Sequence, residues 1–361
     1  MKKRILISSY TGLGNFILKT PFIREIKNLY PECKIDLLCG LPWGAEKVLA
    51  NTNYINEVIW LDPKNSFLKK QILLRNLSKK NYDLIFLPFD ASPNFVVFGS
   101  NFFFRKSQIY SHTNPFQKTI KKTFLRAFFK IFLNNINWVP VTEGTHEIQL
   151  NFDLLDSSIN EYEFADHKNT ETIVSFKKNT VSLPEKFIVF QPISRNGAPS
   201  PKNWPFSNYL ELSKKIINNF KNYKLILVGD KEEGRILNSS EFNLISNVEI
   251  LAGSSDFSDL CNIINGAELI IANDSAVMHI ASALNKKLLA LYGPTDHSRT
   301  KPLSSNAKIL FSKNDSFNAM YSFKKTEDEL NEEYPKDYCM GSLTVDEVYN
   351  EALKILNEKP L

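Results

Sequence analysis

Short apolar runs alternate with amphipathic segments along most of the chain. Each run is five or six residues long, which suits a buried strand, and the segments between them repeat apolar residues at helical spacing. The runs lie at 4–9, 34–39, 57–61, 83–87, 187–191, 224–229, 268–272 and 287–292. The helical segments lie at 16–29, 68–77, 206–220, 256–264, 275–284 and 345–356. Because short strands alternate with helices, the pattern predicts an α/β protein with parallel, helix-covered sheets.

The alternation is interrupted by a polar and irregular stretch at 157–184. The chain has 361 residues, and at about 150 residues per domain this length predicts two domains. We interpret the stretch as a linker. It would separate a first domain over 1–165 from a second over 184–340, followed by a C-terminal helix over 341–361. Each domain should contain a doubly wound sheet, with a cleft between them, and residues 312–337 should form an acidic loop.

Charge divides the chain in a similar way. Residues 1–150 hold 21 basic and 10 acidic side chains, a net charge of +11, whereas residues 151–361 hold 23 and 29, a net charge of −6. A basic half favours an anionic partner such as nucleic acid, a phosphorylated glycolipid or a membrane surface. General lysine enrichment explains the same numbers equally well. The chain contains no recognisable nucleic-acid-binding module, so we do not expect nucleic acid as a partner.

Other sequence features bear on location. No run of about 18 apolar residues occurs, so a membrane-spanning helix is not expected. The first apolar run is too short for the core of a signal peptide. The four cysteines form no C-x-x-C pair, which argues against a zinc cluster and against a disulfide framework. We therefore expect a cytoplasmic protein.

Residues 101–135 combine phenylalanine with basic side chains and contain no glycine. From residue 117 onward, one apolar stripe at helical spacing comprises Ile120, Phe124, Phe128 and Ile131. Five cations lie mostly on other faces of this predicted helix: Lys118, Lys121, Lys122, Arg126 and Lys130. Such a helix packs against its own domain, lies at a membrane surface or binds an acidic ligand, and the pattern leaves these alternatives open.

A glycine-containing turn, Gly12-Leu13-Gly14-Asn15, joins the first strand to the first helix. Glycine lets a backbone approach a ligand closely, and a helix N-terminus favours anions. The turn is not a complete G-x-G-x-x-G, because Ile17 replaces the third glycine, and it is not a P-loop, because no Gly-Lys-Ser/Thr follows. A tight connection between strand and helix is the alternative interpretation.

A second strand–helix junction carries the polar residues Asn273-Asp274-Ser275, with His279 one turn later. The first-turn N–H groups of this helix should face the space beyond the carboxyl ends of the strands, where open α/β sheets bind ligands. The helix dipole would stabilise a diphosphate there. Lys202, in the loop after the first strand of the second half, could reach a phosphate. The alternatives are ordinary N-capping by Asp274, a core position for His279 and a solvated Lys202.

Taken together, these segments resemble glycosyltransferase family 9, the ADP-heptose:lipopolysaccharide heptosyltransferase family. The first strand, turn and helix, with Thr20-Pro21 and Leu29-Tyr30-Pro31, are similar to the start of that family. The most diagnostic matches are Leu251-Ala252-Gly253, Asn273-Asp274-Ser275, 279–284 and Tyr292-Gly293-Pro294-Thr295-Asp296. Weaker matches are His146-Glu147-Ile148 with Asn151 and Leu154-Leu155, Lys202-Asn203-Trp204-Pro205, and Cys339-Met340 with 345–348. The similarity spans nearly the whole chain in the family's order.

The resemblance implies a GT-B fold, with two Rossmann-like domains facing a central cleft. It implies inverting, metal-independent transfer of a heptose or related sugar from a nucleotide-sugar, ADP-linked, to a lipopolysaccharide-type or other cell-envelope glycan. The nucleotide-sugar is a substrate, so no cofactor is expected. An anionic glycolipid acceptor would bring the protein to the cytoplasmic face of the inner membrane.

The resemblance and the charge pattern also assign candidate site residues. The donor-binding candidates are Gln191, Ser194, Lys202, Gly229, Asp274, Ser275, Ala276 and His279. The acceptor-binding candidates are Gly12, Leu13, Gly14, Lys118, Lys121 and Lys122. Without a metal, backbone dipoles and cations must stabilise the departing diphosphate, and the helix start at Ser275 and the Lys202 side chain suit that task.

Three positions depart from the family's pattern. Asn15 stands where the family usually has an acidic residue that acts as general base, and an amide cannot take a proton at neutral pH. Ala276 and Ile193 stand where glycines are usual. Asp90, at the end of the fourth strand, is a possible substitute base, so Asn15 and Asp90 are the catalytic candidates. The alternative function is a non-catalytic homologue that binds a nucleotide-sugar or a glycan.

Overall fold

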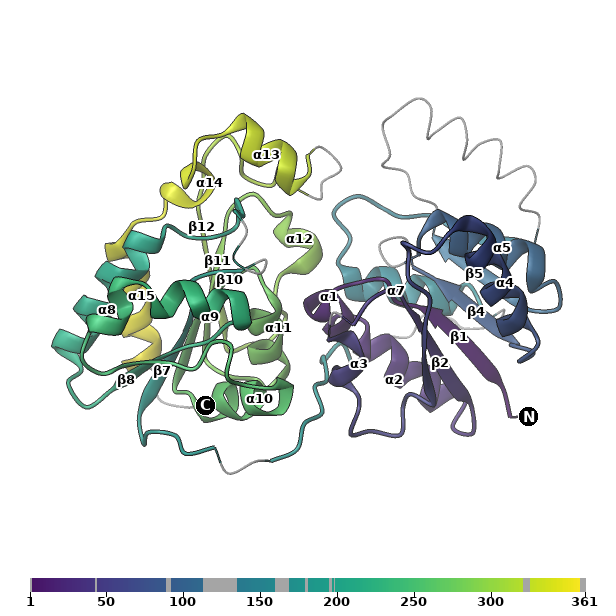
Figure 1. The fold of residues 1–361 in the computed structure, drawn as a ribbon, viewed down its shortest axis with the longest axis horizontal. Coiled ribbons are helices and arrows are strands. Elements are labelled where there is room, and N and C mark those ends of the chain that lie inside the picture. Colours follow the sequence, from purple (N-terminus) through teal and green to yellow (C-terminus); the bar gives the residue numbers. More distant parts are fainter. Residues whose placement is uncertain are drawn as a thin grey trace. The chain divides into compact units, whose positions relative to one another are not determined.

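The computed structural model describes residues 2–42, 44–88, 92–112, 135–159, 169–178, 181–194, 197, 199–320 and 325–357. The chain divides into two compact units, residues 1–175 and residues 176–361. Each unit contains one β-sheet with helices around it (Figure 1).

The first unit is built on six parallel strands in the order β3-β2-β1-β4-β5-β6. They are β1 (Arg4–Ser8), β2 (Lys34–Cys39), β3 (Glu57–Trp60), β4 (Leu84–Leu87), β5 (Gln108–His112) and β6 (Ile136–Val139). The strand order reverses between β1 and β4. Open α/β sheets bind ligands beside such a reversal, beyond the carboxyl ends of the strands.

Helices cover both faces of this first sheet. They are α1 (Leu13–Ile17), α2 (Thr20–Leu29), α3 (Ala45–Val48), α4 (Phe67–Ser78), α5 (Asn94–Phe103) and α7 (Glu147–Asp156). On one face, Phe22 of α2 packs edge-on against Phe86 of β4. On the other face, Leu74 of α4 and Val96 of α5 belong to the same buried cluster as Ile85. Successive side chains of a strand point to opposite faces of the sheet, so neighbouring side chains of β4 pack into two separate cores.

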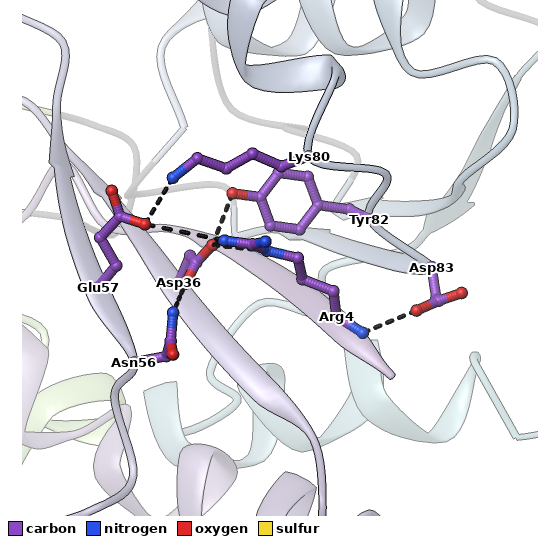
Figure 2. A network of polar contacts seen from close by, with 7 residues as sticks. All are labelled: Arg4, Asp36, Asn56, Glu57, Lys80, Tyr82 and Asp83. Carbon is purple, nitrogen blue, oxygen red and sulfur yellow. Dashed lines mark hydrogen bonds and ion pairs between the residues drawn. The ribbon is translucent and has the colours of Figure 1, made fainter. Parts of the chain in front are cut away.

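A buried carboxylate joins the amino ends of these strands (Figure 2). Asp36 of β2 is fully buried and accepts hydrogen bonds from Arg4 Nε (3.0 Å), Arg4 Nη2 (2.8 Å), the Tyr82 hydroxyl (2.8 Å) and Asn56 Nδ2 (2.7 Å). The backbone N–H of Arg4 donates to Asp83 at 2.7 Å. A buried charge is tolerated when it is paired and hydrogen-bonded in this way. Because the network lies at the end of the sheet opposite to the ligand edge, we assign it a structural role.

The second unit repeats the topology of the first. Its six parallel strands have the order β12-β11-β10-β7-β8-β9, which is the order of the first sheet when strands are counted from β7. They are β7 (Phe187–Gln191), β8 (Lys224–Leu227), β9 (Val248–Ile250), β10 (Leu269–Asn273), β11 (Leu288–Tyr292) and β12 (Ala307–Phe311). Both sheets have the Rossmann strand order, and the reversal in the second lies between β7 and β10.

The helices of the second unit also lie on both faces of its sheet. They are α8 (Phe206–Asn219), α9 (Lys231–Asn238), α10 (Phe257–Gly266), α11 (Ala276–Ala283), α12 (His297–Thr300), α13 (Glu327–Glu333), α14 (Tyr338–Gly341) and α15 (Val345–Asn357), with a 3₁₀ helix at Glu241–Leu244. Helices α8 and α15 pack together (Figure 1), and Leu212 and Val348 join a buried cluster with Phe190 and Ile271 of the sheet. Thr344 and Glu347 exchange hydrogen bonds at the start of α15 and form a capping box.

The predicted α/β fold class is confirmed, with differences in particular elements. The helix predicted at 16–29 is two helices, α1 and α2, with Pro21 in the first turn of α2. The prediction of a loop over 312–337 was wrong, because α13 lies within it. A capping box between Thr326 and Glu329 starts α13, and its Leu330 is fully buried.

The sequence pattern also missed several elements, namely the strands β5, β6, β9 and β12, the helices α3, α5, α7, α9, α12 and α14, and the 3₁₀ helix. The helix predicted at 117–134 lies outside the described residues. Among the residues that the structure describes, none belongs to a helix with the length and apolar character needed to cross a bilayer.

Candidate active site

The strand-order reversal of the second sheet brings two of the predicted polar segments together. Ala272 of β10 pairs with Gln191, the last residue of β7, so the residues after these strands emerge side by side. The Ser275 hydroxyl donates a hydrogen bond to the side-chain oxygen of Gln191. The predicted strand–helix junction at 273–275 therefore lies at the edge where sheets of this order bind ligands.

Asn273 holds this edge together. Its buried side-chain oxygen accepts hydrogen bonds from the backbone N–H of Trp204 (3.0 Å) and from the Tyr209 hydroxyl (3.3 Å). Its side-chain nitrogen donates to the carbonyl groups of Gln191 (3.2 Å) and Pro192 (3.4 Å). The amide thus uses its whole hydrogen-bonding capacity, and it fixes the loop at Trp204 against the ends of β7 and β10.

Asp274 and Lys202 form a largely buried ion pair next to Asn273. Lys202 Nζ lies 3.3 Å from Asp274 Oδ2, and the exposed fractions of these side chains are 15 % and 8 %. Burial by itself raises the pKa of Asp274, but the nearby Lys202 and His279 outweigh it and hold the pKa below its ordinary value. Asp274 is therefore ionised at neutral pH, and the interpretation of Lys202 as a solvated lysine was wrong.

The start of α11 differs from the ordinary cap that was considered for Asp274. Ser275 is the N-cap of α11, and its side chain accepts no hydrogen bond from the first turn. The interpretation of Asp274 as the N-cap was therefore wrong. The first N–H groups of a helix have no partner within it, so the turn that begins at Ala276 can donate to an anion. His279 is buried, as the core interpretation expected, and it nevertheless acts electrostatically on Asp274.

A second carboxylate contacts Lys202, and sequence reasoning missed it. Glu327, the first residue of α13, places its Oε1 3.4 Å from Lys202 Nζ. Its Oε2 accepts a hydrogen bond from the Ser200 hydroxyl at 3.3 Å, and Asn331 Nδ2 donates to the Pro199 carbonyl at 3.2 Å. These contacts dock α13 on the loop that carries Lys202. The acidic composition of 312–337 was visible in the sequence, but its place in the fold was not.

Two other donor-binding candidates have local structural roles. The Ser194 hydroxyl donates to Asn203 Oδ1 at 2.6 Å, within the segment that follows β7. Gly229 follows β8, and a Cβ at this position would lie 2.5 Å from Glu233 Oε2. Because that oxygen accepts the N–H of Asp230 in the capping box of α9, a side chain at Gly229 would disturb the start of the helix.

In the first unit, the predicted acceptor turn lies at the carboxyl end of β1. Gly12 is the N-cap of α1, and a Cβ there would meet no other part of the described chain within 4 Å. Leu13, Gly14 and Asn15 belong to α1, and Asn15 is exposed. The remaining candidates of this unit, Asp90, Lys118, Lys121 and Lys122, lie outside the described residues.

A buried charge pair close to this turn was also missed. Lys19 follows α1 and is fully buried, and its Nζ lies 3.8 Å from Oε1 of Glu147, the first residue of α7. Buried charges require partners, so this pair fixes α7 next to the start of α2. A lysine within an otherwise apolar helical stretch was the available signal in the sequence.

Comparison with solved structures defines the class of fold. The structure of a glycosyl transferase family 9 protein from Veillonella parvula matches with a TM-score of 0.75 at 18 % identity, over 99 % of both chains. An Escherichia coli heptosyltransferase with ADP matches with a TM-score of 0.64 at 16 % identity, over 98 % of this chain and 99 % of that one. Two Rossmann-like sheets with these neighbours define a glycosyltransferase fold of the GT-B class.

Sequence comparison identifies the family. The model of glycosyltransferase family 9 (heptosyltransferase) matches residues 112–331. Lipooligosaccharide heptosyltransferase 2 of Haemophilus influenzae is 24 % identical over 327 residues, which cover 85 % of this chain and 88 % of that protein. The chain belongs to glycosyltransferase family 9 and is a glycosyltransferase. The family and the class of activity predicted from the sequence are confirmed.

Proposed function

We propose that the chain transfers a heptose or related sugar from an ADP-linked donor to a lipopolysaccharide-type acceptor. The H. influenzae relative is named as a lipooligosaccharide heptosyltransferase, and the E. coli structural neighbour is described with ADP, which supports this choice of substrates. The observation that carries the proposal is the Lys202–Asp274 pair at the start of α11, beside the strand-order reversal of the second sheet.

We place the donor diphosphate over the first turn of α11. The N–H groups that begin at Ala276 attract an anion, and Lys202 adds a positive charge at the same edge. Asp274 is ionised and would repel a phosphate in direct contact. Its carboxylate oxygens are instead suited to accept hydrogen bonds from hydroxyl groups of the donor sugar.

We propose that transfer inverts the anomeric carbon and requires no metal ion. The acceptor hydroxyl oxygen attacks the anomeric carbon. The bond between that carbon and the diphosphate oxygen breaks, and its electrons leave with the nucleoside diphosphate. Lys202 and the α11 dipole stabilise the developing negative charge. The hydroxyl proton must pass to a base. Asn15 can orient the hydroxyl but cannot take its proton, so Asp90 is the candidate base.

We propose that the first unit binds the acceptor, at the cytoplasmic face of the inner membrane. Two features support this assignment. The turn that begins at Gly12 lies at the carboxyl end of β1, and residues 1–150 carry a net charge of +11, which favours an anionic glycolipid.

The test is a transfer assay with the purified protein, ADP-heptose and a heptose-free lipopolysaccharide acceptor. Mass spectrometry should show the addition of one heptose, and NMR of the product should show inverted anomeric configuration. Lys202→Met should lower kcat/KM by roughly 10²-fold or more, because a charged contact to the leaving group is lost. Lys308→Met, at an exposed position of β12, is the matched control. Absence of transfer by a protein that demonstrably binds both ligands would contradict the proposal and favour a binding-only function.

A further inference from the structure

Helix α4 exposes more large apolar side chains than any other described helix. The exposed fractions are 64 % for Phe67, 70 % for Leu68, 50 % for Ile72 and 37 % for Leu73. Single exposed apolar residues are ordinary, but several on one short helix form a patch that calls for a partner. The inward side of α4 is already occupied, since Leu74 and Leu77 belong to the buried cluster beneath it. Packing within the described part of the domain therefore does not explain the exposed set.

The same helix is strongly basic. Between Asp62 and Asp83 the sequence has six lysine or arginine residues and no acidic residue. Lys69 and Arg75 of α4 are exposed, and so is Lys79, which caps its C-terminal end. In the described part of the chain, no ion pair involves these three cations. Their positive charge is therefore available to an anionic partner.

Helix α5 extends this combination of apolar and basic groups. It packs closely along α4, since a Cβ at Gly99 would lie 2.4 Å from Leu74 Cδ1, and Figure 1 shows the two helices together. Phe102 of α5 is 54 % exposed, and the Arg105 guanidinium lies over its ring, 5.6 Å from the centroid. Arg105 and Lys106, which follow the C-cap of α5, are both exposed.

We propose that the outer side of α4, together with Phe102 and Arg105, docks on the surface of an anionic lipid bilayer. The exposed apolar side chains would enter the interfacial layer, and the cations would meet the lipid headgroups. A second copy of the chain fits less well, because a two-fold interface would bring the same cations face to face. The inference rests on the proposed function in that the proposed acceptor is a membrane glycolipid.

The experiment measures binding of the full chain to two kinds of vesicle, one of phosphatidylcholine alone and one with about a third phosphatidylglycerol. The wild type should bind the anionic vesicles more tightly, and added salt should weaken that binding, because exposed charges are screened over about 8–10 Å at 0.1–0.15 M salt. The double variant Leu68→Ser/Ile72→Ser should bind the anionic vesicles about ten-fold more weakly, because apolar surface no longer enters the interface. The triple variant Lys69→Gln/Arg75→Gln/Lys79→Gln should lose about five-fold per cation on anionic vesicles and little on neutral ones.

Leu244→Ser is the matched control for the apolar variant, because Leu244 is 83 % exposed and lies in the second unit. It should leave vesicle binding unchanged. All of these positions are exposed, and equal melting temperatures would confirm that the variants fold. Unchanged binding by the double variant would overturn the proposal, and so would equal binding of the wild type to both vesicle types. Concentration-dependent dimerisation that the double variant abolishes would instead assign this side of α4 to a second copy.

Transfer to a delipidated, soluble acceptor separates this inference from the proposed function. The α4 variants should retain that activity, because no residue of α4 is placed in the reaction. A protein that binds anionic vesicles through α4 but transfers no sugar to any acceptor would contradict the proposed function alone.

Discussion

Lys202 has two carboxylate partners, and this arrangement opposes the binding of a phosphate. Its Nζ lies 3.3 Å from Asp274 Oδ2 and 3.4 Å from Glu327 Oε1, so the three groups together carry one net negative charge. A donor diphosphate that contacts Lys202 must compete with Glu327 for the ammonium protons. We therefore expect Glu327→Gln to bind ADP more tightly than the wild type does.

The size of the effect follows from this geometry. A phosphate oxygen in contact with Nζ would lie roughly 6 Å from the Glu327 carboxylate, where two unit charges at an effective dielectric constant of about 20 repel by about 3 kcal/mol. The Glu327 side chain is 17 % exposed, so solvent and salt screen part of this repulsion. A remainder of about 1 kcal/mol corresponds to roughly five-fold tighter binding of ADP.

Isothermal titration calorimetry with ADP at neutral pH and low salt measures this change. Glu332→Gln removes the same charge from an exposed position of α13 and serves as the control, with little expected change in affinity. The alternative role for Glu327 is to hold Lys202 in position for the ligand. Unchanged or weaker ADP binding by Glu327→Gln would refute the competition argument. An equal gain for Glu332→Gln would show only a general effect of charge.

Three further predictions concern the reaction and the pH dependence of the protein's stability. Asn15→Asp should raise turnover by up to about 10²–10⁴-fold if the acceptor docks in the family's geometry, whereas little change together with a comparable loss in Asp90→Asn would identify Asp90 as the base. The low pKa of Asp274 contributes stability above the ordinary aspartate pKa, and this contribution disappears as the pH falls through the folded-state value. Chemical unfolding should therefore show wild type and Asp274→Asn converging below about pH 4, and a gap that stays constant would contradict this. Transfer should persist in excess chelator, and loss of activity that magnesium or manganese restores would overturn metal-independent transfer.

The strands that could be predicted from the sequence are those with continuous apolar runs. In β1, β4, β7 and β10 nearly every residue is buried, because helices cover both faces of a parallel sheet. The edge strand β6 (Ile136–Val139) was missed because it contains polar and exposed residues and lacks such a run. Helix α13 was missed for another reason. Its outer side is almost wholly acidic, so one buried leucine and a capping box determine it rather than an apolar stripe.

In the candidate site, the features that could be predicted depend on local sequence, and those that were missed depend on contacts between distant segments. Asp274, Ser275 and Lys202 could be predicted, because a strand end followed by a helix start is a local signal. The role of Asp274 could not be predicted, because the choice between capping α11 and pairing with Lys202 depends on where a distant loop packs. Glu327 was missed because only the docking of α13 brings it to Lys202.

The four hydrogen bonds of Asn273 bear on the thermodynamics of donor binding. The loop at Trp204 is bonded to a fully buried side chain at the end of β10, so that part of the loop cannot detach without leaving buried polar groups unpaired. An aspartate in place of Asn273 would have nearly the same shape. It would, however, face the carbonyls of Gln191 and Pro192 with a second acceptor oxygen instead of an N–H donor. Lys202 lies two residues before Trp204, so its backbone loses conformational entropy when the protein folds and not when the donor binds. More of the interaction energy with the diphosphate then remains as affinity when the donor binds.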